Sequence, residues 1–332
     1  MAEHSAVLTR LRKPLGLVAT CLRHIPRLSL YWTIRLALHG VDPRCASYDP
    51  SSKRLSLDDL DIRLSRDRHV IFLKEYNATL LPLVAREKAA FFNDEAGEIG
   101  VEVDGARMIL RTWEELFILG EIFLEKIYAL DYDRDVVVLD IGMNVGFASL
   151  YYAARENVHA VFGYEPFRKT YEGALHNFSL NPELSKKIRP FNTGAGASDT
   201  TRTLDYCHDW KGMISTTDGG DHAGFPPGPS TRETVEIRNI VDIVDSARSE
   251  TDDCEIIAKI DCEGAEYEIL EVLDAAGRLS LFRAMIIEWH DKGPGVLVRT
   301  LEKNGFRISA RSLTKSGTSG MIYAARIGKD RR

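Results

Sequence analysis

The stretch from Val136 to Phe147, VVVLDIGMNVGF, constrains the fold more than any other part of this sequence. Four consecutive apolar residues open it, as expected of a strand that is buried on both faces. Asp140 ends this apolar run, and Gly142 and Gly146 follow within six residues. The next residues, up to position 154, favour a helix, so the stretch predicts a strand, a tight glycine-rich turn and a helix.

Such a turn suits a nucleotide ligand, because glycine lets the backbone approach closely and a helix N-terminus offers unpaired N–H groups. The dinucleotide fingerprint Gly-x-Gly-x-x-Gly is not met, since Asn144 replaces its second glycine and Gly146 comes early. Glu165 follows the apolar run 160–164, where an acidic side chain can bind a ribose diol. The pattern predicts a nucleoside site and argues against a pyrophosphate site.

Four motifs together resemble those of the FkbM-type methyltransferases, which are class I enzymes that depend on S-adenosylmethionine. The resemblance covers roughly residues 133–306 and implies a Rossmann-like α/β fold, with a seven-stranded, mostly parallel sheet and helices on both faces. It implies S-adenosylmethionine as the cofactor and does not indicate the acceptor. The motifs are Asp140-Ile-Gly-Met-Asn-Val-Gly146, Tyr164-Glu-Pro-Phe167, Lys259-Ile-Asp-Cys-Glu-Gly-Ala-Glu266 and Ile287-Glu-Trp-His290.

The resemblance also implies which residues bind the cofactor. In class I methyltransferases the turn after the third strand borders the adenine, and Asp199 stands in the corresponding turn here; an ordinary turn aspartate is the alternative. The expected cofactor-binding residues are Asp140, Gly142, Asn144, Gly146, Glu165 and Asp199.

Acidic and imidazole side chains end two later apolar runs. Asp261 and Glu263 follow the run 254–260, and His290 follows the run that ends at Ile287. Open α/β sheets bind ligands at the carboxyl ends of their strands, so we expect these three residues to be catalytic. One of them would accept the proton of a hydroxyl group. Alternatively an acidic cluster can hold Mg²⁺; the metal-free route is preferred, because the resembled family is not generally metal-dependent.

The function implied by the resemblance is methyl transfer to a hydroxyl of a sugar, a lipid-linked glycan or a natural product. A cofactor-binding module without chemistry is one alternative. A nicotinamide-dependent oxidoreductase is another, disfavoured because the dinucleotide fingerprint is absent. Methylation of an adenine or glutamine nitrogen is disfavoured too, since Asp261-Cys-Glu-Gly264 stands where those enzymes carry an Asn-Pro-Pro-Tyr-like motif.

Charge and cysteine content narrow the partners and the compartment. The 332 residues carry a formal net charge of −6, which gives no support to a nucleic-acid partner. The five cysteines are an odd number without a Cys-x-x-Cys pair, so neither a disulfide framework nor a zinc knuckle is indicated. The cysteines favour a cytoplasmic protein, whereas a small-molecule or glycan acceptor is what the resemblance implies.

Three segments are expected: a basic amphipathic helical segment (1–40), an appendage (41–130) and the cofactor-binding domain (131–332). The first segment carries six basic residues and one acid, and predicts packing within its own domain, a homodimer contact or a peripheral membrane contact. In the appendage, the composition of residues 41–67 predicts a linker or a loosely structured stretch. A hairpin is expected across Asp104-Gly105, followed by a helix of about four turns that begins with a capping box at Thr112 and Glu115.

A long polar segment, 206–232, is rich in Gly, Pro, Ser and Thr. Structureless loops of this length are usually functional or disordered. On the substrate side of the sheet it would be an acceptor-binding loop, and its candidate contacts are His208, Asp209, Trp210 and His222.

Overall fold

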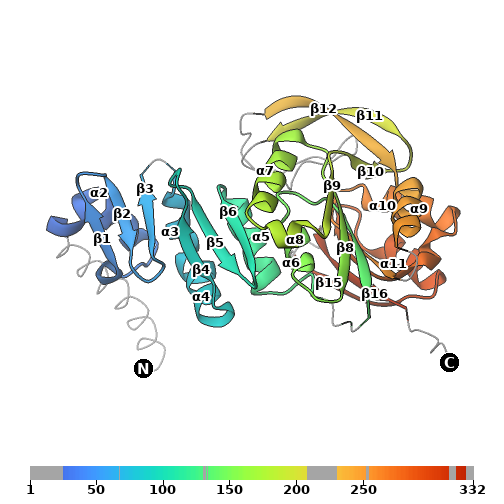
Figure 1. Cartoon of the computed structure of the whole chain (residues 1–332), viewed down its shortest axis with the longest axis horizontal. Coiled ribbons are helices and arrows are strands. Elements are labelled where there is room, and N and C mark those ends of the chain that lie inside the picture. Colours follow the sequence, from blue (N-terminus) through green and yellow to red (C-terminus); the bar gives the residue numbers. More distant parts are fainter. Residues whose placement is uncertain are drawn as a thin grey trace, which may run out of the picture. The chain divides into compact units, whose positions relative to one another are not determined.

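The computed structural model describes residues 25–66, 68–129, 132, 134–207, 230–251, 254–313 and 319–326. The chain divides into two compact units, Met1–Glu125 and Lys126–Arg332. Figure 1 shows the whole chain, coloured from the N-terminus to the C-terminus.

The second unit is built on a sheet of seven strands. These are β7 (Val136–Ile141), β8 (Val158–Tyr164), β9 (Ile188–Phe191), β13 (Glu255–Ile260), β14 (Phe282–His290), β15 (Arg307–Ser312) and β16 (Ser319–Ala325). Their order is β15-β16-β14-β13-β7-β8-β9, with β16 antiparallel to both of its neighbours and the other strands parallel. The predicted Rossmann-like, mostly parallel seven-stranded sheet is confirmed.

Helices cover both faces of this sheet: α6 to α8 lie on one side and α9 to α11 on the other (Figure 1). Their bounds, with those of the short 3₁₀ turn η4, are α6 (Phe147–Ala153), α7 (Arg168–Ser179), α8 (Pro182–Ser185), α9 (Ile240–Glu250), α10 (Glu266–Ala275), η4 (Arg278–Leu281) and α11 (Gly295–Lys303). The two layers of helices explain why all six side chains of β7 are buried.

The register of the parallel strands decides where the polar residues meet. Ile141 at the end of β7 pairs with Tyr164 on β8 and with Ile260 on β13, and Ile260 pairs with Ile287 on β14. The residues that follow these positions therefore share one edge of the sheet, the carboxyl edge at which open α/β sheets bind ligands.

A separate three-stranded sheet follows β9 in the sequence and has the order β10-β12-β11. Its strands are β10 (Gly194–Gly196), β11 (Thr200–Cys207) and β12 (Ser230–Asn239). The predicted loop 206–232 is therefore shorter than expected, because β11 and β12 extend into both of its ends. The candidate contacts His208, Asp209, Trp210 and His222 lie outside the described residues.

In the first unit the expected hairpin is confirmed. It consists of β5 (Ile99–Val103) and β6 (Ala106–Leu110), and β4 (Ala90–Asn93) pairs with β5. Asp104 and Gly105 in its turn both have positive φ, as a two-residue hairpin loop requires. Helix α5 (Trp113–Phe123) begins with the predicted capping box of Thr112 and Glu115, but it has eleven residues and is shorter than expected.

The prediction that residues 41–67 form a linker was wrong. They form an antiparallel sheet of β1 (Ala46–Asp49), β2 (Arg54–Leu57) and β3 (Ile62–Ser65). The alternating apolar residues of β2 and β3 carry this sheet, since one face of an antiparallel sheet can be buried while the other stays polar. The buried residues are Leu55, Leu57, Ile62 and Leu64.

Helix α2 (Ile25–Leu38) contacts β1. One side of it buries Leu28, Trp32 and Leu36, whereas Leu30, Ile34 and Leu38 are among the exposed large apolar residues. In the described part of the chain, no helix combines the length and apolar character needed to cross a membrane. The remaining elements of this unit are η1 (Pro43–Cys45), α3 (Val70–Glu75), η2 (Tyr76–Leu80) and α4 (Leu81–Glu87).

Candidate active site

The turn between β7 and α6 takes a shape that needs glycine. Gly142 has φ +79°, and a Cβ there would lie 1.7 Å from the carbonyl oxygen of Asp261, so no larger residue fits. Gly146 has φ +83° and stands at the N-cap of α6. Asn144 also has positive φ, which asparagine tolerates better than most residues. The predicted strand, turn and helix are confirmed.

Glu165 follows β8 directly and is only 6% exposed. Its carboxylate accepts hydrogen bonds from the backbone N–H of Asn144 at 3.0 Å and of Phe167 at 3.0 Å. Burial raises the pKa of Glu165 to about 7, although the two N–H groups act in the opposite direction. The side chain thus joins the glycine turn to the end of β8, where a ribose is expected.

Asp140, an expected cofactor-binding residue, has a fully buried side chain, and its contact with the cofactor stays a prediction. One of its oxygens accepts a hydrogen bond from the Ser149 hydroxyl at 2.6 Å, and the other lies 3.3 Å from the Lys259 ammonium. Lys259 also donates to the carbonyl of Gly142 at 2.6 Å. Asp140 therefore acts inside the protein, where it helps to position the turn.

Sequence reasoning missed the role of Lys259. Burial alone would lower the pKa of Lys259, but the charges of Asp261 and Asp140 outweigh burial and raise it. A lysine inside the apolar strand run 254–260 was the available signal, because a buried charge requires a partner. Lys259 reaches Asp261 at 3.4 Å and so connects the cofactor turn to the next strand end.

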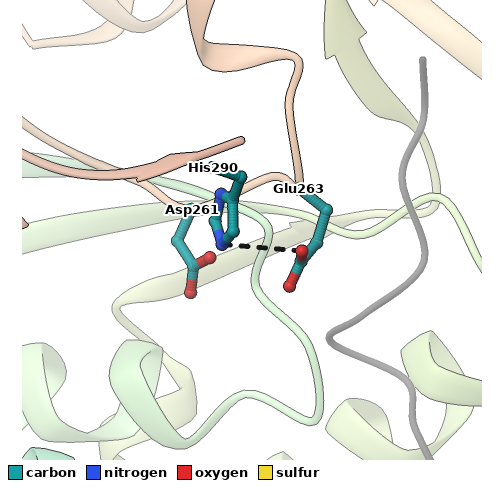
Figure 2. A group of neighbouring side chains, drawn as sticks. All are labelled: Asp261, Glu263 and His290. Carbon is teal, nitrogen blue, oxygen red and sulfur yellow. Dashed lines mark ion pairs between the residues drawn. The ribbon is translucent and has the colours of Figure 1, made fainter. Parts of the chain in front are cut away.

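The structure brings together the three expected catalytic residues. One ligand-type atom from each of Asp261, Glu263 and His290 lies within 4.8 Å of the others. Figure 2 shows them gathered at one point, with the ion pair of 3.5 Å between His290 Nε2 and Glu263 drawn as a dashed line. Asp261 and Glu263 come from the turn between β13 and α10, and His290 is the last residue of β14. All three side chains are partly exposed.

Two further carboxylates surround His290. Glu266, fully buried, lies 3.3 Å from His290 Nδ1 and accepts a hydrogen bond from the His290 backbone N–H at 2.7 Å. Glu288 lies 3.7 Å from His290 Nε2. Burial alone would lower the pKa of His290, but Glu263, Glu266 and Asp261 raise it to about 10. The raised pKa means that His290 holds its proton more tightly than a free histidine does, and its role as the proton acceptor stays a prediction.

The two other members of the group have opposite pKa shifts. Burial raises the pKa of Glu263 well above its usual value. Burial also acts on Asp261, but Lys259 and His290 outweigh it and lower the pKa of Asp261. The Tyr128 hydroxyl donates to Asp261 at 3.0 Å, so Tyr128 reaches the expected site through this contact.

Asp199 is exposed and lies in the turn between β10 and β11. One of its carboxylate oxygens accepts a hydrogen bond from the backbone N–H of Asn239, at the end of β12, at 2.7 Å. This contact fixes the turn and leaves its adenine contact as a prediction.

Comparison with known proteins decides the family. Residues 140–308, just over half of the chain, match the family model described as the methyltransferase FkbM domain. The chain belongs to this family. Residues 140–308 form an S-adenosylmethionine-dependent methyltransferase domain, and the cofactor expected from the sequence is confirmed.

Several known proteins are similar in sequence or structure to part of this chain. It is 27% identical to the AMB antimetabolite synthetase AmbE of Pseudomonas aeruginosa over 71% of its own length, which is only 13% of that protein. It is 25% identical to the methyltransferase sdnD of Sordaria araneosa, covering 59% of this chain and 83% of sdnD. A crystal structure of methyltransferase FkbM from Methylobacillus flagellatus aligns with a TM-score of 0.40 and 16% identity over 76% of this chain and 59% of that one.

In this chain the surroundings of Glu165 fit the ribose of S-adenosylmethionine. The buried carboxylate of Glu165 has only backbone N–H donors among its described hydrogen-bond partners, and a carboxylate oxygen can accept more than one hydrogen bond. Ribose hydroxyl groups are donors of the kind that this carboxylate can accept. When bound, S-adenosylmethionine supplies a methyl group on a positively charged sulfur.

Proposed function

We propose that this methyltransferase transfers the methyl group to a hydroxyl oxygen, and that the acceptor is a sugar, a lipid-linked glycan or a hydroxylated natural product. The observation that carries the proposal is the group of Asp261, Glu263 and His290 at the carboxyl edge of the sheet. This group lies at the same edge of the sheet as the glycine turn and Glu165.

The chemistry needs little more than positioning and a place for one proton. As the acceptor's oxygen forms its bond to the methyl carbon, the carbon–sulfur bond breaks and S-adenosylhomocysteine leaves. The hydroxyl proton passes to a carboxylate, either Asp261 or Glu263. An in-line displacement with a good leaving group gains most of its acceleration from the placement of the two reactants.

An oxygen acceptor is favoured by the acidic character of the group. An amine acceptor would be held as a cation by these carboxylates, and a protonated amine is not a nucleophile. The glycan preference rests on family resemblance alone. The cytoplasmic location, the homodimer and the peripheral membrane contact stay predictions from the sequence.

The test is an acceptor screen with purified protein and S-adenosylmethionine. Matched alcohols and amines of the same sugar or natural-product scaffold are compared, and S-adenosylhomocysteine formation is measured by mass spectrometry. We expect product with alcohols only, and a methoxy group in its NMR spectrum. Methylation of nitrogen or carbon would refute the proposal.

A variant pair links this activity to the group. Asp261→Asn combined with Glu263→Gln should lower turnover about 10² to 10⁴-fold, because it removes both carboxylates that are proposed to take the proton. Glu271→Gln, an exposed change on α10, is the control and should have wild-type activity. Equal turnover in the double variant would remove these carboxylates from the reaction.

A further inference from the structure

We propose that Asp261, Glu263 and His290 bind one divalent cation, with two carboxylate oxygens and one imidazole nitrogen as ligands. This deepens the proposed function, because the cation would hold the acceptor's hydroxyl oxygen and lower its pKa. The sequence alone favoured a metal-free reaction, so the inference comes from the geometry of the group.

The set of donor atoms fits one divalent cation. Three residues each offer one ligand atom, and these atoms lie within 4.8 Å of one another, which is a separation that one ion can bridge. Asp261 and Glu263 are two residues apart on one turn, and His290 comes from the neighbouring strand. Carboxylate oxygens suit Mn²⁺, and imidazole nitrogen is a common ligand of first-row divalent ions, so this mixed set of donors is compatible with Mn²⁺.

The orientation of the His290 imidazole also suits a metal ligand. The buried carboxylate of Glu266 lies 3.3 Å from His290 Nδ1, and it also accepts hydrogen bonds from the backbone N–H groups of His290 and Gly264. Glu266 is thus held rigidly behind the ring, and Nδ1 is the nitrogen that donates to it. Nε2 is left facing Glu263 and Glu288. A carboxylate that holds the far nitrogen of a ligating histidine is the usual arrangement around protein-bound metals.

The charges around His290 favour a bound cation as well. Three carboxylates, those of Glu263, Glu266 and Glu288, lie within 3.7 Å of nitrogens of one imidazole, and Asp261 is nearby. Lys259 contacts Asp261, but Asp140 shares it. Since like charges at this distance repel each other, a divalent cation relieves more repulsion than a single proton on His290 can.

The test is Mn²⁺ binding by the full chain, without cofactor or acceptor. Titration followed by electron paramagnetic resonance of free Mn²⁺ should give one site per chain. Pulsed spectra of the bound ion should show coupling to an imidazole nitrogen. Asp261→Asn with Glu263→Gln should weaken binding by more than about 100-fold, and Glu266→Gln, which alters a positioning residue, by about 10 to 100-fold.

Two controls separate the possible failures. Glu271→Gln should bind Mn²⁺ like the wild type, and circular dichroism spectra should show that the other variants are folded. Absence of binding at millimolar Mn²⁺, absence of the nitrogen coupling, or equal affinity of the Asp261 and Glu263 variant would each overturn the cation site. Methyl transfer to alcohols in the presence of a chelator would do the same while leaving the proposed function intact; cation binding without any alcohol methylation would refute only the proposed function.

Discussion

Asp140 and Glu165 are two carboxylates at the ends of neighbouring parallel strands, and burial makes them alike, with exposed fractions of 0% and 6%. Their partners make them different. Asp140 pairs with the Lys259 ammonium and the Ser149 hydroxyl, whereas Glu165 accepts only backbone N–H groups among its described hydrogen-bond partners. The charge of a buried carboxylate beside an ammonium group is balanced within the protein. One held by N–H groups alone keeps the capacity to bind a further donor.

On the neighbouring strand β13, a lysine contacts two carboxylates that differ in exposure. Lys259 lies between Asp140 and Asp261, so a single buried cation serves one closed and one partly exposed carboxylate. The buried pair of Asp140 and Lys259 fixes the turn, whereas the partly exposed Asp261 belongs to the proposed catalytic group. Four changes would sharpen or break this division.

The largest effect should come from Lys259→Met. It leaves Asp140 buried without its cation, and breaking a buried pair by removing one partner costs about 3–5 kcal/mol. We expect a loss of this size in the free energy of unfolding, measured with urea.

The control is the double variant Asp140→Asn with Lys259→Met, which removes both charges. It should recover a large part of the loss, because neither partner is left unpaired. If Lys259→Met lost less than about 1 kcal/mol, the pair of Asp140 and Lys259 would not hold the turn.

The pH dependence of stability should depend on Glu165, whose pKa is raised from 4.5 to about 7. Below pH 4.5 this carboxyl is protonated in both the folded and the unfolded chain. Between pH 4.5 and about 7 the unfolded chain releases the proton while the folded chain keeps it, so folding becomes less favourable as the pH rises. At about 1.4 kcal/mol per pKa unit, wild type should lose on the order of 3 kcal/mol over this range relative to Glu165→Gln.

Urea unfolding at several pH values checks this slope difference between wild type and Glu165→Gln. The absolute stability of the variant does not matter, since only the difference in slope reports the Glu165 proton. Parallel curves would mean that Glu165 is ionised at ordinary pH and that Asp140 and Glu165 are more alike than their partners suggest.

Much of the cofactor site was predictable from sequence, and there is a physical reason why the pairing of its buried charges was not. The strand, the glycine turn and Glu165 are local signals, because an apolar run, positive φ and a strand-end acid each show in a few residues. The pairing of Asp140 with Lys259 joins residues 119 positions apart, and periodicity cannot report it. The raised pKa of His290 likewise depends on Glu263 and Glu266, which are distant from it in the sequence.

The first unit shows a different kind of miss. Residues 41–67 are polar with prolines, which predicted a linker, yet Leu55 and Leu57 alternate with serine and arginine in β2. Strands of four residues carry too few positions for a period of two to stand out. The capping box of α5, by contrast, was correct, because it is a spacing rule that involves only Thr112 and Glu115.

The affinity for S-adenosylmethionine tests directly whether Glu165 binds the cofactor. Glu165→Gln should weaken S-adenosylmethionine binding by about 1–3 kcal/mol, the range for a hydrogen bond to a charged group. Isothermal titration calorimetry measures it. Asp140→Asn in the same assay should have the smaller effect, because that side chain is fully buried. The reverse ranking would exchange the roles of the two carboxylates.

The smallest effect is expected at Asp199, an exposed carboxylate held by one backbone N–H. If it also accepts a hydrogen bond from the adenine amino group, Asp199→Ala should weaken S-adenosylmethionine binding by about 1 kcal/mol. Sinefungin, which has the same adenine, should lose the same amount, whereas the inosine analogue of the cofactor, which lacks the amino group, should bind wild type and variant equally. An equal loss for the inosine analogue would mean that Asp199 acts only through the turn it fixes at Asn239, and that an exposed carboxylate at this edge need not bind the cofactor.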